Sequence, residues 1–129
     1  MQGDKLFQTI NIVVGTAWVV AGLVSLGLSF PLIAGQVGPN PLYGARFREA
    51  FQSDEAWYAI NRFGGQRFAL WSLAQTACGI AAYFAPLKNN DALTIMVGVA
   101  PIAFVLIPMF QTWRFAKRLV IPAPNPPKQ

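Results

Sequence analysis

Residues 6–45, LFQTINIVVGTAWVVAGLVSLGLSFPLIAGQVGPNPLYGA, form a run of forty residues without a charge. Two further uncharged apolar runs follow at 68–87 and 92–113. A helix needs roughly 20 apolar residues to cross a hydrocarbon core about 30 Å thick, and each run supplies them. The sequence therefore predicts an all-α membrane protein with three transmembrane helices, at about 6–31, 68–87 and 92–113.

The distribution of charge argues against a soluble domain of the same composition. Hydrophobic residues make up 54% of the chain, which is only modestly above the usual share in soluble domains. A soluble helix carries charges every few residues along its outer face, whereas all ten Lys and Arg residues lie outside the three runs. Little chain remains between the runs, so residues 1–129 are predicted to form a single three-helix transmembrane domain.

The basic residues predict how the chain is oriented. Short loops that stay in the cytoplasm are enriched in Lys and Arg. Eight of the ten lie in the segment after the first run and in the tail, while the other side has Lys5 and Lys88. We therefore expect the N-terminus outside and the C-terminus in the cytoplasm. A cleaved signal peptide is disfavoured, because the first five residues are nearly neutral and the apolar run exceeds the about 7–15 residues of a signal core. The proline-rich tail, 119–129, should be extended and flexible.

The residue types within the spans exclude most chemistry. Ionisable residues inside a membrane usually mark ion or proton pathways, and the three runs contain none. The chain has no histidine, the commonest metal ligand, and its one cysteine, Cys78, is expected to be a small apolar filler. No nucleophile with a base, carboxylate dyad or phosphate loop is recognisable. We expect a protein that is not an enzyme and has no catalytic residue, metal site or cofactor; residues holding a pigment or quinone by packing would leave no motif.

Small residues repeated every four positions mark faces where membrane helices approach closely. The expected seams of the bundle are one row on the first helix and two adjacent rows on the second: Ala17, Ala21, Ser25 and Ser29, and Ala74, Cys78 and Ala82 beside Ala77, Ala81 and Ala85. Trp18 lies in the middle of the first span, where it is either lipid-facing or a wedge against another helix or a partner.

The polar segment, residues 40–65, carries the most specific pattern. Pro-Asn-Pro at 39–41 favours a turn, and Gly44 permits a backbone conformation closed to other residues. Ser53 can cap a helix whose first turn holds two acids. We expect a short amphipathic helix lying in the cytoplasmic interface, which turns into the second span near the Gly-Gly pair at 64–65.

The residues of this segment follow the order Asn-x-x-aromatic-Gly-x-Arg and then Ser-Asp-Glu-x-Trp-x-x-x-Asn-Arg-Phe-Gly-Gly. This order resembles the signature of the SdpI family of small bacterial membrane proteins, in its three-helix form, where the signature lies between membrane helices. The family usually continues the Arg with Thr, whereas Phe47 follows here. The resemblance makes five residues the candidate partner-binding positions: Asn40, Gly44, Arg46, Trp57 and Asn61.

The resemblance implies a protein of the bacterial cytoplasmic (inner) membrane that works by binding. The founding member of the family is a longer protein that acts as an immunity factor against a secreted killing peptide and as a membrane trap for a transcriptional repressor. For this chain it implies an immunity or signalling role. Arg46 could hydrogen-bond a carboxylate, a phosphate or backbone carbonyls in two-pronged fashion; a structural role for it, tying the loop beneath the bundle, stays open as well.

Two other functions stay open. The first is an accessory subunit of a larger membrane complex, which suits a chain of three helices with small-residue faces and no catalytic group. The second is a small transporter or channel, which the uncharged spans favour least. The expected partners are membrane lipids and either other membrane protein subunits or a peptide toxin or regulator. Nucleic acid is not expected, because the basic residues are spread over two flanks. The oligomeric state is left open.

Overall fold

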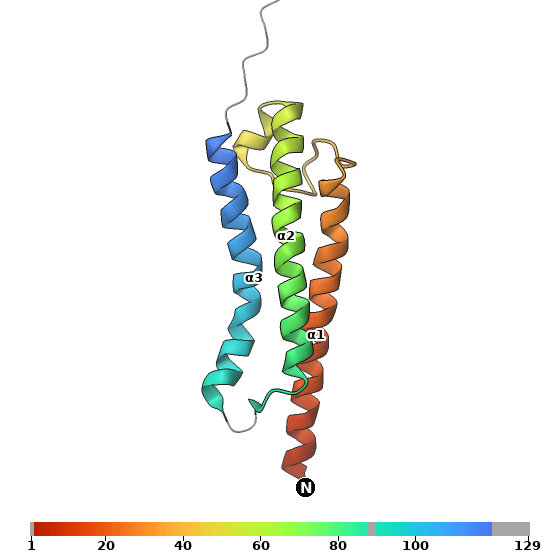
Figure 1. Cartoon of the computed structure of the whole chain (residues 1–129), viewed down its shortest axis with the longest axis vertical. Helices are drawn as coiled ribbons and strands as arrows, with labels where there is room; N and C mark the ends of the chain where they lie inside the picture. Colours follow the sequence, from red (N-terminus) through yellow and green to blue (C-terminus); the bar gives the residue numbers. More distant parts are fainter. Residues whose placement is uncertain (1, 88–89, 120–129) are drawn as a thin grey trace, which may run out of the picture.

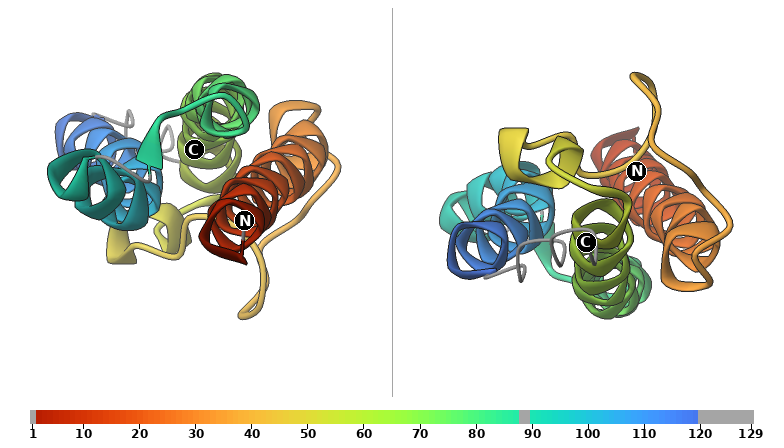
Figure 2. Two further views of the ribbon diagram at one scale, coloured as in Figure 1. Left: turned by 90° about the horizontal axis from the view of Figure 1, so that it is seen from below. Right: turned by 90° about the horizontal axis from the view of Figure 1, so that it is seen from above.

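The computed structural model describes residues 2–87 and 90–119, which form three long helices and one short 3-10 helix. The elements are α1, Gln2–Ile33; η1, Arg48–Phe51; α2, Asp54–Ala82; and α3, Asp91–Arg118. The three long helices lie side by side, with α2 between α1 and α3, and each helix runs antiparallel to the next in sequence (Figure 1 and Figure 2). The described residues contain no strand, so the all-α prediction is confirmed.

Among the described helices, α1 and α3 are long and apolar enough to cross a membrane, over Gln8–Ile33 and Asp91–Arg118. Most of their large apolar side chains face outward and are exposed in the isolated chain. The second predicted span, 68–87, is not confirmed. The apolar part of α2 begins only after Arg67 and the helix ends at Ala82, because the next residues form the turn toward α3.

Glycine and serine residues spaced by seven form the seam between α1 and α2. A Cβ atom on Gly15 would lie 2.9 Å from the Gly79 carbonyl oxygen, and one on Gly65 would lie 3.0 Å from the Ser29 carbonyl oxygen. Midway between these contacts, Gly22 faces the backbone of Ser72. The missing side chains let the two backbones approach each other, as at small-residue interfaces in membranes.

The seams predicted from the four-residue rows were mostly wrong. Ala17 and Ala21 of α1 and Ala74, Ala77, Cys78 and Ala81 of α2 are exposed, whereas Ser29 and Ala82 are buried. The actual seam uses glycine, which has no Cβ atom, or serine, whose side chain is short, at every second turn. A glycine permits a closer approach than an alanine, and this difference selects the face that α1 and α2 share.

Aromatic side chains attach α3 to the other two helices. Trp18 is buried and meets the Phe104 ring edge-on, with ring centroids 5.7 Å apart, so it acts as a wedge between α1 and α3. Trp71 lies 5.9 Å from the same Phe104 ring and donates a hydrogen bond to Gln111 at 3.3 Å. Apart from such side-chain contacts, α1 and α3 pack mainly on α2 and little on each other.

The predictions of a separate interfacial helix and of a turn at Gly64–Gly65 were also wrong. Residues from Asp54 to Ala82 form one continuous helix, in which both glycines are buried. A Cβ on Gly64 would lie 3.0 Å from the side chain of Thr112 on α3, while Gly65 faces α1. The pair therefore serves close packing on two sides of α2 rather than a change of direction.

Local capping signals fix the helix ends. The Ser53 hydroxyl accepts a hydrogen bond from the backbone N–H of Ala56 at 3.1 Å, which confirms the predicted cap of α2. α1 ends at Ile33, and Gly35, two residues further on, has a φ of +68°, which suits the left-handed position that closes a helix. The prediction of a flexible tail concerns residues 119–129, of which only Leu119 lies within the described part of the chain.

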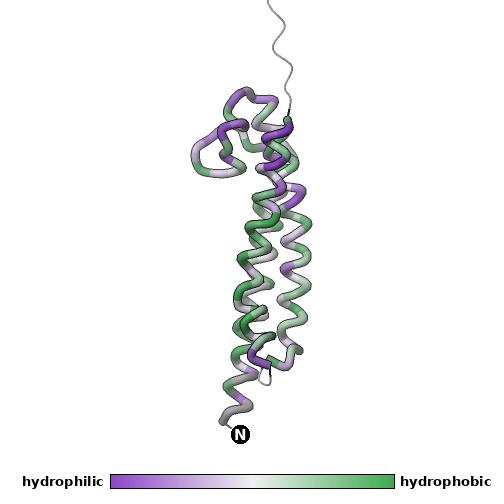
Figure 3. Tube along the Cα trace, turned by 90° about the vertical axis from the view of Figure 1, so that its left-hand side faces the viewer, coloured by the Kyte–Doolittle hydropathy of each residue, from purple (hydrophilic) through white to green (hydrophobic). Residues whose placement is uncertain are grey.

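Polar residues gather at one end of the bundle, where the loop between α1 and α2 lies beside the C-terminal end of α3 (Figure 3). The opposite end holds the N-terminus and the turn between α2 and α3 (Figure 1). We refer to the first as the loop end. It brings the polar segment and the basic end of α3 to the same side, because the three long helices alternate in direction along the chain.

Candidate functional site

Asn40 organises the turn that starts the loop. Its side-chain oxygen accepts hydrogen bonds from the backbone N–H groups of Leu42, at 2.9 Å, and Tyr43, at 2.8 Å. Its amide nitrogen donates to the carbonyl oxygens of Gly38 and Tyr43, at 2.9 and 3.1 Å. One carboxamide thus replaces four contacts that water would otherwise make with this turn. The role of Asn40 is to hold the loop.

Gly44 and Asn61 meet where the loop reaches α2. Asn61 is 2% exposed; its side-chain oxygen accepts a hydrogen bond from the Ala45 N–H at 2.6 Å, and its amide nitrogen donates to the Trp57 carbonyl at 3.0 Å. Gly44 has a φ of +109°, and a Cβ there would collide with the Asn61 side-chain oxygen. This position requires glycine on two counts, conformation and space.

Trp57 fastens the loop from the other side. It is fully buried, and its indole N–H donates a hydrogen bond to the Val37 carbonyl oxygen at 2.8 Å. The ring packs with Ala50, Ile60 and Ala116 in the core of the loop end. Phe47, which stands where the family usually has Thr, packs against the same core. A larger apolar residue therefore contributes to the loop's attachment at this position.

Two further hydrogen bonds fix the loop, one to the bundle and one within the loop itself. The Tyr43 hydroxyl donates to the carbonyl oxygen of Leu28 in α1, and Arg46 donates from Nη1 to the Pro41 carbonyl oxygen. Burial raises the pKa of the Tyr43 phenol from its ordinary value. Arg46 differs from the other motif residues because its side chain is exposed.

An ion pair joins the loop to α3. The Lys117 ammonium donates a hydrogen bond to the Glu49 carboxylate on η1. That hydrogen bond is the main reason why the pKa of Glu49 is lowered from its ordinary value. Among the side chains that the structure describes, it is the one ion pair. The remaining cations of the loop end have no carboxylate of the described residues within 4 Å.

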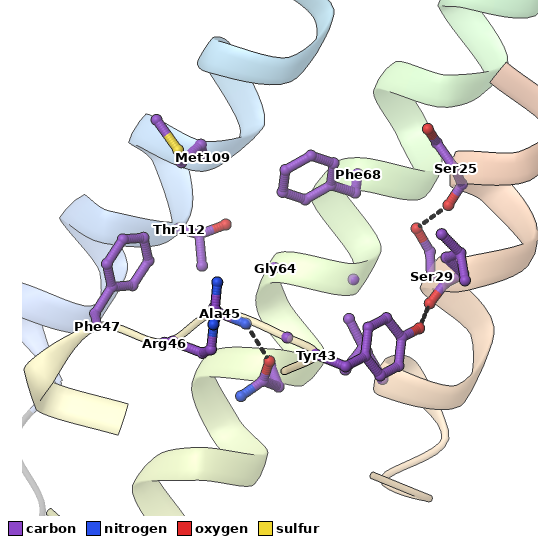
Figure 4. A pocket seen from close by; sticks show the side chains of 15 residues that line it. Ser25, Ser29, Tyr43, Ala45, Arg46, Phe47, Gly64, Phe68, Met109 and Thr112 are labelled. Atoms are coloured by element: carbon purple, nitrogen blue, oxygen red, sulfur yellow. Dashed lines mark hydrogen bonds between the residues drawn. The ribbon is translucent and has the colours of Figure 1, made fainter. Parts of the chain in front are cut away.

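These contacts enclose a cavity of about 480 Å3 beneath the loop. All three long helices and the loop contribute to its wall, as Figure 4 shows. Its lining is mostly apolar and includes Leu28, Phe47, Phe68 and Met109. Arg46 lines it as well, and in the view of Figure 4 its side chain stands between Phe47 and Tyr43. The volume lies within the range of about 300–1,000 Å3 that small-molecule sites occupy.

The five candidate residues of the motif therefore lie together but have different roles. Asn40, Gly44, Trp57 and Asn61 form the internal ties of the loop, and Arg46 is left facing the cavity. Gly44, Arg46 and Asn61 all line it. Sequence reasoning missed the contributions of α1 and α3, such as Ser25 and Thr112, since no local pattern links distant helices. Tyr43 was within reach, because the motif itself contains an aromatic residue at that position.

No group of three or more metal-binding side chains occurs in the described part of the chain. The cavity instead offers apolar walls and one guanidinium, which suits an amphiphile or an apolar side chain with an anionic group. In comparisons with known proteins, the model of the SdpI/YfhL protein family matches residues 36–110, from the loop through α2 into α3. Searches of curated proteins and of solved structures gave no match.

Proposed function

The chain belongs to the SdpI/YfhL protein family, and from this premise we propose that it is a non-catalytic membrane protein that acts by binding, in an SdpI-like immunity or signalling role. Family membership and two apolar helices of spanning length indicate a membrane protein. The proposal adds the mode of action, the partner and the orientation. Each of these is supported by the arrangement of the loop end.

The bundle is proposed to cross the bacterial inner membrane with the loop end in the cytoplasm and the N-terminus outside. The loop and the C-terminal end of α3 lie at the same end of the bundle (Figure 1). That end carries most of the basic residues, as cytoplasmic segments do. In this arrangement α2 crosses beside its neighbours, with Arg62 and Arg67 at the level of the headgroups and its apolar part, after Arg67, in the hydrocarbon core.

One observation carries the proposed mode of action: the loop is fixed by internal hydrogen bonds and yet presents large apolar side chains outward. Leu42, at the turn that Asn40 organises, is 86% exposed, and Phe51 on η1 is 51% exposed. Large exposed apolar patches mark interaction sites, and we propose that Leu42 and Phe51 belong to such a patch beyond the spanning helices. We assign this surface to a regulator on the cytoplasmic side.

A specific feature of α3 supports the alternative, an accessory subunit of a larger membrane complex. Only 6% of the apolar window in α3 is buried within the chain, against 22% in α1. An outer helix with so little contact to its own bundle could pack against a neighbouring subunit. The two functions differ in what they require, since an accessory subunit needs its complex, whereas an immunity or signalling protein works as a separate component.

The proposal is tested by expressing the chain in a bacterium that lacks it and following two responses, survival under a secreted killing peptide and the transcript profile. Wild-type chain should change at least one of them. Leu42→Ala should abolish the transcriptional response, because it removes the exposed side chain of the loop. Phe84→Ala is the matched control, since Phe84 is 85% exposed at the opposite end of the bundle. A wild-type chain that changes neither response contradicts the proposal.

A further inference from the structure

The cavity beneath the loop combines one cationic group with apolar walls. Arg46 comes from the loop, while Leu28, Phe68 and Met109 come from α1, α2 and α3. Leu28 and Met109 lie in the apolar helices α1 and α3, and Phe68 begins the apolar part of α2. The loop end is the more polar end of the bundle (Figure 3). The cavity therefore lies at the boundary between the apolar length of the bundle and its loop end. In a membrane this boundary is the level of the lipid headgroups.

Of the four residues with a hydroxyl group that line the cavity, Ser25, Ser29, Tyr43 and Thr112, the last three already use it as a donor within the chain. Ser29 donates to the Ser25 carbonyl at 2.8 Å, Thr112 donates to the Pro108 carbonyl at 2.7 Å, and Tyr43 donates to a carbonyl of α1. Hydroxyls that are satisfied in this way do not demand water. Apart from Ser25, whose side chain is only partly buried, the walls can consequently accommodate a hydrocarbon chain without leaving a hydroxyl donor unpaired.

Arg46 is the donor that remains for a ligand. Its guanidinium has five N–H groups. Among the described residues, its one hydrogen bond is donated to the Pro41 carbonyl oxygen. No carboxylate of the described residues lies within 4 Å of it. A guanidinium with several unused donors in a fixed planar fork favours a phosphate or carboxylate with two free oxygens.

The surrounding charges favour an anionic ligand as well. The loop end holds an excess of cations over carboxylates: Arg46, Arg48, Arg62, Arg67, Arg114, Lys117 and Arg118 against Glu49, Asp54 and Glu55. One of the carboxylates, Glu49, is already paired with Lys117. Basic pockets between membrane helices on the cytoplasmic side are known to hold anionic headgroups.

We propose that the cavity is a binding site for one anionic phospholipid, whose phosphate is held by Arg46 and one of whose acyl chains lies against Leu28, Phe68 and Met109. The phospholipid satisfies both halves of the site at once, since it carries a phosphate and an apolar chain on the same molecule. The inference is independent of the proposed immunity or signalling role, and it is tested by lipid binding alone.

The headgroup half is tested by native mass spectrometry of the purified full chain in a neutral detergent, titrated with phosphatidylglycerol and with zwitterionic phosphatidylcholine. Wild-type chain should retain one phosphatidylglycerol in preference to phosphatidylcholine. Arg46→Ala should weaken phosphatidylglycerol binding by about tenfold or more, the equivalent of a lost charge-assisted hydrogen bond. Arg48→Ala is the matched control, because Arg48 is equally charged, exposed and nearby but does not line the cavity.

The acyl-chain half is tested by filling the cavity. Ser25→Phe places a ring where Ser25 lines the cavity, and Ala21→Phe places the same ring one turn away on exposed surface. Ser25→Phe should lose phosphatidylglycerol retention while Ala21→Phe keeps it. Far-UV circular dichroism and the elution volume confirm that each variant is folded.

Three outcomes would overturn the proposal. Equal retention of the two lipids by wild-type chain would show that the phosphate is not recognised. Equal losses in Arg46→Ala and Arg48→Ala would show only a general attraction of the basic end. Unchanged retention in Ser25→Phe, or a bound peptide in place of lipid, would show that the acyl chain does not occupy the cavity.

Discussion

Gly44→Ala is the substitution that tests the loop's attachment most sharply. Gly44 has a φ of +109°, which a residue with a Cβ adopts only with strain. The added methyl group would also displace the Asn61 carboxamide, which accepts a hydrogen bond from the Ala45 N–H. Strain of this kind costs about 1–3 kcal/mol, and the displaced hydrogen bond adds about 1 kcal/mol. We expect a total loss of about 2–4 kcal/mol in the free energy of unfolding.

The measurement is unfolding in mixed detergent micelles, followed by far-UV circular dichroism, together with limited proteolysis of the loop. Gly38→Ala is the control, because Gly38 is in the same loop, has an ordinary φ, and a Cβ there would lie at a comfortable 3.6 Å from the Tyr58 hydroxyl. It should unfold like wild type. Gly44→Ala should unfold earlier and expose the loop to protease.

A double-mutant cycle separates the two causes. In the Asn61→Ala background the collision with the carboxamide is gone, so Gly44→Ala should cost less than it does in wild type, leaving mainly the backbone strain. Equal stability of Gly44→Ala and Gly38→Ala would refute the reasoning outright. Full additivity of the Gly44 and Asn61 substitutions would refute the contact between them.

Three further outcomes are expected. Trp57→Phe should lower the free energy of unfolding by about 1–3 kcal/mol, because it leaves a buried loop carbonyl unpaired; thermal unfolding measures it. Gly79→Val should destabilise the α1–α2 seam by about 1–3 kcal/mol through overpacking, whereas Cys78→Val, on exposed surface, should be neutral in the same assay. The pKa of Glu49 is lowered from its ordinary 4.5 by Lys117. Its contribution to stability is therefore present above pH 4.5 and is lost as the pH falls through the lowered value; the stability difference between wild type and Glu49→Gln should vanish in acid.

Local signals in the sequence were sufficient where one residue decides one feature. Ser53 predicts a cap because its hydroxyl reaches the first turn of its own helix, and the structure confirms that cap. Asn40 likewise predicts a turn, because its side chain reaches backbone groups a few residues away. The absence of charge over long runs likewise predicts α1 and α3, because a membrane-spanning helix needs about 20 consecutive apolar residues.

Features that depend on a distant partner could not be predicted. The Gly64–Gly65 pair permits a turn or a close contact, and only the positions of Thr112 on α3 and Ser29 on α1 decide between them. The seam of α1 is another case, because Ala17 and Gly15 both look like interface residues until the face of α2 is known. The cavity at Arg46 combines side chains from all three long helices and the loop, so no contiguous motif describes it.

The family signature acquires a physical meaning from these contacts. Four of its residues, Asn40, Gly44, Trp57 and Asn61, hold the loop against α2 through turn, steric fit and hydrogen bonds. The fifth, Arg46, is placed by that loop at the cavity. The signature thus builds a hydrogen-bonded loop that places one guanidinium at the cavity and leaves apolar side chains exposed.

The central claim, that the chain works as a separate binding protein in the membrane, is tested most directly by purifying it from bacterial membranes in a mild detergent. All accompanying proteins are identified, and the absorption spectrum of the same sample is recorded. The account predicts a colourless chain, alone or as a homo-oligomer, that keeps its stability without other subunits. A fixed set of stoichiometric subunits, or a bound pigment, would contradict it and establish the accessory-subunit alternative.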